Sequence, residues 1–196
     1  LRKYQKKIFL NLWRFYLMMI SENLFLYLGD ITEIKTEALV NPANTSLLGG
    51  GGVDGLIHRK GGRQILDDCM KIRARQGGCK VGEAVITRAG NLPANYVIHT
   101  VGPVWNDGNH DEKKLLERAY FSCLEVAEKN GISEISFPNI STGRYGFPKK
   151  LAAEIAIKTV ISYLSIHDVI KKVNFVCYDS EDYRFYQDYL AVLKVC

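Results

Sequence analysis

Asp54 and His58 are two residues whose types and spacing suit acid–base chemistry. They stand four positions apart in a segment that reads as a helix, so they share one helix face and His58 could orient the carboxylate of Asp54. A carboxylate there also stabilises the N-terminus of a helix, and a lone histidine on a helix is more often a packed residue. The pair therefore allows two interpretations, a general base with an orienting partner or the ordinary start of a helix.

Two glycine-containing loops accompany this pair. Four consecutive glycines, Gly49 to Gly52, directly precede it, and a second loop runs from Ser141 to Gly146. Each loop follows an apolar strand and precedes a helix, so its N–H groups and the helix N-terminus can hold an anion. Either loop alone could be a tight turn. Two of them at one edge of an α/β sheet could hold a diphosphate from opposite sides.

Two known nucleotide-binding motifs can be tested against the glycines. Gly50, Gly52 and Gly55 match the dinucleotide pattern G-x-G-x-x-G, but residues 42–48 separate them from the preceding strand. No acidic residue ends a second strand about twenty residues later, as a dinucleotide dehydrogenase requires. No Gly-Lys-Ser/Thr follows the glycines either, which excludes a Walker loop that reaches a γ-phosphate.

Asn41 and Asn44 flank a short Pro-Ala turn just before the glycines. Turns favour asparagine because its side chain hydrogen-bonds the nearby backbone. An amide also suits ribose hydroxyls, because it both donates and accepts hydrogen bonds. The residues alone leave both interpretations open.

Strand-like and helix-like segments must position these side chains, and they alternate through most of the 196 residues. Apolar β-branched runs bounded by glycine or proline predict strands, and apolar residues at helical spacing predict helices. Strands are expected at 24–28, 38–41, 83–88, 96–101, 132–138 and 172–178, and helices at 53–60, 63–75, 112–129, 151–164 and 182–193. The alternation predicts one α/β domain, a three-layer α/β/α sandwich with helices on both faces of the sheet.

Charge and cysteine content exclude several classes of protein. The net charge is +5, but residues 1–20 carry five basic residues and no acidic one, so residues 21–196 are close to neutral. Nucleic-acid binding by the domain therefore has no support from charge. The five cysteines are widely spaced and form no C-x-x-C pair. This predicts free thiols in a reducing compartment, hence a cytoplasmic protein, rather than a disulfide framework or a zinc site.

The first 22 residues are expected to be an extension separate from a domain at residues 23–196. Their apolar run from Ile8 to Ile20 is broken by Asn11 and Arg14 and is too short for a membrane span. No small-residue cleavage site marks a signal peptide, and a basic amphipathic helix stays open. Nucleic-acid binding through this extension is a separate alternative, which would show a steep dependence on salt.

Six motifs in order carry a family resemblance. They are LGDIT (28–32), VNPAN (40–44), LLGGGGVDGLIH (47–58), VIHTVGPVW (97–105), FPNISTGRYGFP (137–148) and VCYDSEDY (176–183). Over about residues 24–194 the chain resembles the macro domains of the MacroD type. The resemblance implies a mixed, mainly parallel sheet between helices and a site for ADP-ribose. It also implies removal of ADP-ribose from acidic protein side chains and deacetylation of O-acetyl-ADP-ribose.

The resemblance assigns a role to individual residues of this chain. Asp30 would accept a hydrogen bond from the adenine amino group, the Ile31 N–H would meet a ring nitrogen, and Tyr178 would lie against the adenine face. Asn44, with Asn41, would hold the distal ribose, and Asp54 would lie near its C1″ carbon. The diphosphate would lie between two backbone segments. The first consists of Gly51, Gly52 and Val53, and the second of Ser141, Thr142, Gly143, Arg144 and Tyr145. Tyr145 would also pack on the distal ribose.

The expected reaction is hydrolysis without a metal or cofactor. Asp54, Asn44 and His58 are the expected catalytic residues. Asp54 would activate a water that cleaves the bond at C1″, and this cleavage resembles that of a glycoside. The expected partners are ADP-ribose, mono-ADP-ribosylated proteins and O-acetyl-ADP-ribose, with no nucleic acid or membrane, and a monomer is expected. A non-catalytic reader of ADP-ribose and an esterase or phosphatase on free ADP-ribose derivatives are the alternatives.

Two positions depart from the family pattern. Pro42 replaces the commoner alanine in the Asn-Ala-Ala-Asn motif and stiffens the turn. Arg144 stands where the family often has an aliphatic residue, and it could either reach the diphosphate or face solvent.

Overall fold

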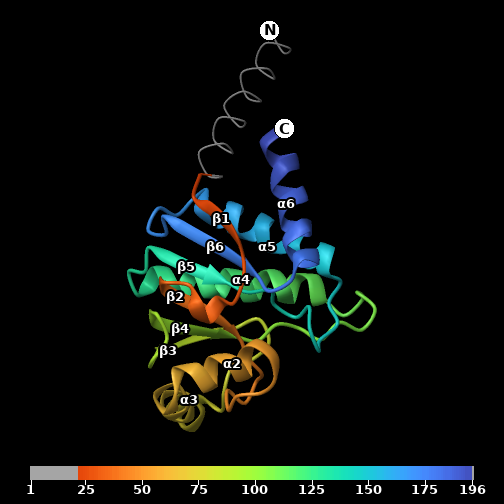
Figure 1. Ribbon diagram of the computed structural model, residues 1–196. Helices are drawn as coiled ribbons and strands as arrows, with labels where there is room; N and C mark the ends of the chain where they lie inside the picture. Colours follow the sequence, from red (N-terminus) through yellow and green to blue (C-terminus); the bar gives the residue numbers. More distant parts are fainter. Residues whose placement is uncertain (1–21, 196) are drawn as a thin grey trace.

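The computed structural model describes residues 22–195 and shows a six-stranded sheet between two layers of helices (Figure 1). The strands are β1 (Leu24–Leu28), β2 (Thr36–Pro42), β3 (Ala84–Arg88), β4 (Ala94–Thr100), β5 (Glu134–Phe137) and β6 (Lys172–Cys177). The helices are α2 (Gly52–Gly61), α3 (Arg63–Gln76), α4 (Glu112–Lys129), α5 (Lys149–Leu164) and α6 (Ser180–Val195), with a short 3₁₀ helix η1 (Ile31–Glu33). The predicted three-layer sandwich is confirmed. The expectations for residues 1–21 lie outside the described residues.

The strand order is β1-β6-β5-β2-β4-β3, which no reading of consecutive elements would give. Neighbouring strands are parallel except for β3 and β4, which pair antiparallel. The sheet is therefore mixed and mainly parallel, as the family resemblance implied. Five strands end at the same edge, and the loops that leave this edge are the ones that carry the glycines. Such an edge is where open α/β sheets bind ligands.

Each face of the sheet has its own hydrophobic core. On one face α4, α5 and α6 pack over the sheet, and the large buried side chains there include Tyr120, Phe137 and Phe175. On the other face α2 and α3 cover β2, β3 and β4 around Leu39, Ile57 and Ile65. Figure 1 shows α2 and α3 together on the side of β3 and β4. The helix that follows the first glycine loop is thus held against the sheet by its own apolar face.

The helix ends follow the expected signals, with differences of one or two residues in α2, α3, α5 and α6. The helix α4 has the predicted bounds and ends before Gly131, whose φ of 66° suits glycine. The helix α5 begins at Lys149, two residues before the predicted start at residue 151, and Pro148 is its N-cap. Within residues 22–195 no helix combines the length and apolar character that a bilayer span needs.

Candidate active site

A cleft of about 690 Å³ opens along the edge where the parallel strands end. Its walls come from segments that follow β1, β2, β4, β5 and β6, together with the first turn of α2. The expected residues that line it are Asp30, Ile31, Asn44, Gly51, Gly52, Val53, Asp54, Ser141, Thr142, Gly143, Arg144, Tyr145 and Tyr178. The structure therefore brings together residues that lie more than one hundred positions apart in the chain. Asn41 and His58 are not part of this lining.

Two glycines at the first loop and the start of α2 have no room for a side chain, because other groups occupy the space. A Cβ on Gly50 would lie 2.9 Å from Oδ2 of Asp54 and 3.3 Å from Nδ2 of Asn44. A Cβ on Gly55 would clash with the carbonyl oxygen of Gly50. Gly52 has a φ of 59°, a conformation that glycine adopts without strain. These glycines let the loop backbone pass close to the start of α2, and Gly50, Gly51 and Gly52 line the cleft.

Asp54 lies in the first turn of α2 and its side chain is nearly buried. Its Oδ1 accepts a hydrogen bond of 2.7 Å from Nδ2 of Asn41. Burial raises the pKa of Asp54, while the bond from Asn41 and the proximity of His58 oppose that rise. A carboxylate with a raised pKa at the edge of a cleft is the type of group that accepts a proton in catalysis.

His58 and Asn41 lie behind Asp54 rather than in the cleft. Nε2 of His58 is 3.5 Å from Oδ1 of Asp54, and this nitrogen has no hydrogen-bond partner among residues 22–195. Asn41 was expected beside the ribose, but the structure buries it completely. The sequence prediction placed His58 correctly near Asp54 but assigned Asn41 to the ribose, whereas the structure places Asn41 behind Asp54. The direct hydrogen bond, however, comes from Asn41 and not from His58.

Asn44 makes the turn contacts that one of the two interpretations predicts, and it also lines the cleft. Its Oδ1 accepts hydrogen bonds from the N–H and the hydroxyl of Ser46, at 3.0 and 2.6 Å, as in an asparagine-stabilised turn. Its Nδ2 donates to the carbonyl oxygen of Gly49 at 2.9 Å. Asn44 also lines the cleft on the same side of Gly50 as Asp54. The turn therefore fixes the orientation of this amide at the edge of the cleft.

The second loop is held in shape by its own backbone and by one close neighbour. The N–H of Phe147 donates to the carbonyl oxygen of Ser141 at 3.0 Å, and Ser141 has a φ of 67°. Gly102, which follows β4, leaves no room for a Cβ because the hydroxyl of Ser141 occupies that space. A non-glycine residue in this conformation costs about 1–3 kcal/mol, and such strain is often found at ligand sites.

The buried carboxylate of Glu112 holds the segment after Trp105, and Trp105 in turn contacts the second loop. The N–H of Trp105 donates to the carbonyl oxygen of Tyr145 at 2.8 Å, and Trp105 packs edge-on against Phe147. The segment after Trp105 is pinned by Glu112, whose carboxylate accepts three backbone N–H bonds from residues 106, 108 and 110. Burial opposes ionisation of Glu112, but these donors outweigh it and lower its pKa to about 2.

The other end of the cleft carries the residues expected to meet adenine. Oδ1 of Asp30 accepts from the N–H and hydroxyl of Thr32, and its Oδ2 pairs with Nζ of Lys60 at 3.0 Å. Burial raises the pKa of Asp30, but the bonds from Thr32 and Lys60 outweigh it and lower that pKa. Tyr178 is 76% exposed, so its ring offers an open face to a flat ligand. Asp182 at the start of α6 also lines this end and pairs with Lys149 at 3.1 Å.

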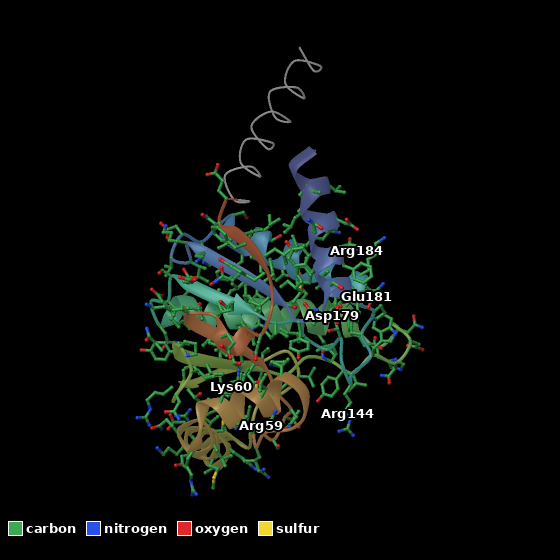
Figure 2. All side chains as sticks on the ribbon, viewed as in Figure 1. Arg59, Lys60, Arg144, Asp179, Glu181 and Arg184 are labelled. Atoms are coloured by element: carbon green, nitrogen blue, oxygen red, sulfur yellow. The ribbon has the colours of Figure 1, made fainter. Side chains whose placement is uncertain are left out.

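Arg144 extends away from the body of the domain. Figure 2 shows its side chain at the tip of the second loop, directed outward, and the residue is exposed. Arg144 also lines the cleft, so its position is compatible with both interpretations, contact with a diphosphate and exposure to solvent. Figure 2 also shows Asp179 and Glu181 near the start of α6, where both carboxylates pair with Lys149 at 3.2 and 2.8 Å.

Sequence reasoning missed three residues of this site. Gly102 and His99 belong to the quoted segment VIHTVGPVW, but neither their spacing nor their types showed that they reach the loops and Asp54. Asp182 was read as the start of a helix and not as part of the cleft. The position of His99 on a strand next to the one that carries Asn41 is a property of the sheet pairing. Only the strand order could have indicated it.

The fold and the site together define a class of protein. It is a three-layer α/β domain whose cleft is lined by two glycine-containing loops, an exposed aromatic ring and a nearly buried carboxylate. The chemistry of this lining suits a nucleoside diphosphate that carries a further sugar, because loops that precede helices can hold a diphosphate and an aromatic ring can stack on a base.

Comparisons with known proteins give the family. A family model described as the macro domain matches residues 40–156. O-acetyl-ADP-ribose deacetylase 1 of Pantoea vagans (strain C9-1) is 61% identical over 158 residues, which cover 81% of this chain and 92% of the relative. O-acetyl-ADP-ribose deacetylase of Escherichia fergusonii is 55% identical over 163 residues, or 83% and 92% of the two chains. The chain belongs to the macro domain family.

Solved structures agree with this membership. An Oceanobacillus iheyensis macrodomain with ADP is 43% identical, with a TM-score of 0.81, over 86% of this chain and 90% of that one. A Trypanosoma brucei macrodomain in complex with ADP-ribose is 39% identical, with a TM-score of 0.79, over 86% of this chain and 69% of that one. The sequence prediction of a macro domain is therefore confirmed.

Proposed function

We propose that this protein hydrolyses derivatives of ADP-ribose, namely O-acetyl-ADP-ribose and mono-ADP-ribosyl esters of acidic protein side chains. The observation that carries the proposal is the nearly buried carboxylate of Asp54, which lies with Asn44 against Gly50 at one end of the cleft. Relatives that are 55–61% identical are named O-acetyl-ADP-ribose deacetylase. Two related structures are named as holding ADP or ADP-ribose.

The cleft supports one orientation of the ligand. Adenine would lie on Tyr178 with its amino group toward Asp30, and the diphosphate would accept hydrogen bonds from the backbone of the two loops. The distal ribose would then reach Asn44 and Asp54. The main contribution of the protein would be to hold the ester in place, because positioning alone supplies a large part of many rate enhancements.

Asp54 would act on a water molecule at the distal ribose. The water oxygen bonds to C1″ of a glutamyl ester, its proton passes to Asp54, and the bond between C1″ and the acyl oxygen breaks. The products are ADP-ribose and the free side-chain carboxylate. The negative charge of Asp54 also stabilises the positive charge that develops on the ribose. With O-acetyl-ADP-ribose the water oxygen bonds to the acetyl carbonyl carbon and its proton passes to Asp54. The bond between that carbon and the ribose oxygen then breaks, the ribose oxygen takes the proton from Asp54, and acetate and ADP-ribose are released.

A reader module without turnover shares every binding feature and is the second candidate. We favour hydrolysis because a carboxylate that is removed from water beside a bound diphosphate weakens binding unless it serves the reaction. The names of the close relatives point the same way. The neutral charge of residues 21–196 gives no reason to propose a nucleic-acid partner for the domain.

Parallel assays of wild type, Asp54→Asn and Asp54→Ala test the proposal. Release of acetate from O-acetyl-ADP-ribose and of ADP-ribose from a glutamate-modified protein should fall by about 100-fold or more in both variants. Calorimetry should show ADP-ribose affinity largely retained. Asp67→Ala, which removes a carboxylate 43% exposed on α3, should behave as wild type. Binding without turnover by wild type would instead assign the protein to the readers.

A further inference from the structure

A row of buried polar side chains runs from Asp54 into the core beneath α2 and α3. Nδ2 of Asn41 lies 2.7 Å from Oδ1 of Asp54 and 3.0 Å from Nδ1 of His99. Nε2 of His99 lies 2.9 Å from the hydroxyl of Thr87, which is 3.1 Å from the carbonyl oxygen of Arg88. Asn41 and His99 are both completely buried. Fully buried polar side chains are retained at a cost in desolvation, so this row calls for an explanation.

The direction of each hydrogen bond in the row follows from its end at Asp54. An ionised carboxylate only accepts, so Asn41 must donate to it through one N–H. The second N–H of the same nitrogen then points to Nδ1 of His99, which must accept. Nε2 of His99 therefore carries the proton and donates to Thr87, whose hydroxyl donates to the backbone. One tautomer of His99 is thus compatible with every hydrogen bond of the row.

The surroundings hold His99 in its neutral form. Burial, with a smaller effect of His58, lowers the pKa of His99 to about 3. His58, Cys69 and His99 also stand close enough to share a metal ion. Both ring nitrogens of His99 are already engaged, however, and burial raises the pKa of the Cys69 thiol to about 12, which disfavours the thiolate that binds metals. The hydrogen-bonded row is therefore the better account of this cluster.

We propose that His99 is a positioning residue for the hydrolysis described above: as the Nε2–H tautomer it fixes the amide of Asn41, which in turn holds the carboxylate of Asp54 toward the cleft. This inference rests on the proposed function of Asp54. Asn41 and His99 occupy directly paired positions of the neighbouring parallel strands β2 and β4. The sheet thus sets their spacing before any ligand binds, as a preorganised site requires.

Substitution of His99 should lower turnover without a matching loss of binding. In His99→Leu, Asn41 loses its acceptor and can turn away from Asp54, and kcat should fall about tenfold or more while ADP-ribose affinity stays within about twofold. His99→Asn can place an amide oxygen near the former Nδ1 and should recover part of that kcat. Thr100→Val is the matched control. It removes a buried hydrogen bond from the adjacent residue of β4 that does not reach Asp54, and it should leave kcat unchanged.

A double-mutant cycle separates positioning from general damage. In a protein that already carries Asp54→Ala, His99→Leu should reduce the residual rate no further, because the carboxylate that it positions is absent. An equal loss of kcat in both backgrounds, or a loss that the Thr100→Val control shares, would overturn the proposal.

The tautomer of His99 can be measured without any turnover. Long-range ¹⁵N–¹H spectra of wild type at neutral pH should show a protonated Nε2 and an unprotonated Nδ1. A protonated Nδ1 would make His99 the donor and reverse the row, which would refute the proposal. Absence of hydrolysis by wild type would refute the proposed function instead, and the tautomer would still decide the direction of the hydrogen bonds.

Discussion

A single methyl group at Gly50 is expected to separate catalysis from binding in this protein. The backbone of Gly50 does not have a positive φ, so alanine can adopt its conformation. The added Cβ, however, would lie 2.9 Å from Oδ2 of Asp54 and 3.3 Å from Nδ2 of Asn44. The effect of Gly50→Ala should therefore come from the contact with these two side chains and not from strain in the loop.

The size of the effect follows from the distance. Ordinary contacts of a Cβ begin at 3.4 Å, so the carboxylate of Asp54 must move by about 0.5 Å. A misplacement of about 1 Å costs on the order of 100-fold in rate, so half that displacement predicts a loss of roughly tenfold in kcat. The diphosphate and adenine contacts lie elsewhere in the cleft, and the affinity for ADP-ribose should change less than the rate.

The assay compares kcat for O-acetyl-ADP-ribose with the dissociation constant of ADP-ribose in the same variant. The control is Gly50→Ala in a protein that already carries Asp54→Ala, where the methyl group no longer meets a carboxylate and should cost little of the residual rate. A kcat within twofold of wild type for Gly50→Ala would refute the reasoning. So would an equal loss in both backgrounds, since the methyl group would then act on something other than Asp54.

Three further predictions follow from groups around the cleft. Tyr178→Ala should weaken ADP-ribose binding about three- to tenfold in calorimetry, because its exposed ring is the expected stacking surface, while Tyr178→Phe should not. The value of kcat/KM should fall as the pH drops below the pKa of Asp54, because a protonated carboxyl cannot accept a proton. Burial raises this pKa, so the inflection should lie above the ordinary 3.8. An inflection at or below pH 3.8 would contradict this prediction. Glu112→Gln should lower the urea midpoint of unfolding at pH 7, because the ionised carboxylate of Glu112 stabilises the fold. The difference in midpoint from wild type should shrink as pH falls from 4.5, the ordinary pKa of glutamate, towards about 2, because Glu112 becomes protonated. An equal difference at pH 3 would contradict this prediction.

The sequence was most informative where local signals decide structure. The helix Glu112–Lys129 and the strand Leu24–Leu28 have the predicted bounds. Apolar spacing and the Asn-Gly stop after Lys129 mark the helix, and an apolar run that ends at Gly29 marks the strand. The helix that begins at Lys149 was predicted from Leu151, because two lysines carry no apolar signal. The strand order, in contrast, depends on long-range pairing and came only with the structure, since the family resemblance implied a mixed, mainly parallel sheet without an order.

In the candidate site, too, contacts between residues close in the sequence were predicted, and contacts across the sheet were not. The spacing of Asp54 and His58 correctly predicted that they are neighbours, because a helix places residues four apart on one face. It did not predict that the 3.5 Å between them falls short of a hydrogen bond. The partner that does bond to Asp54 is Asn41, and behind it stands His99, 58 residues further along the chain. No local pattern encodes a contact across two strands, so this part of the site required the structure.

The buried thiols can report how often the helices that cover each face of the sheet move away from it. All four cysteines of the described region are free and buried: Cys69, Cys79, Cys123 and Cys177. The first two belong to the core under α2 and α3, and the other two to the core under α4, α5 and α6. Burial raises the pKa of all four, so they react with a thiol reagent only when the layer above them opens. The rate at which each pair is labelled thus reports separately how often each face of the sheet is uncovered, and whether ADP-ribose keeps the face beside Asp54 closed.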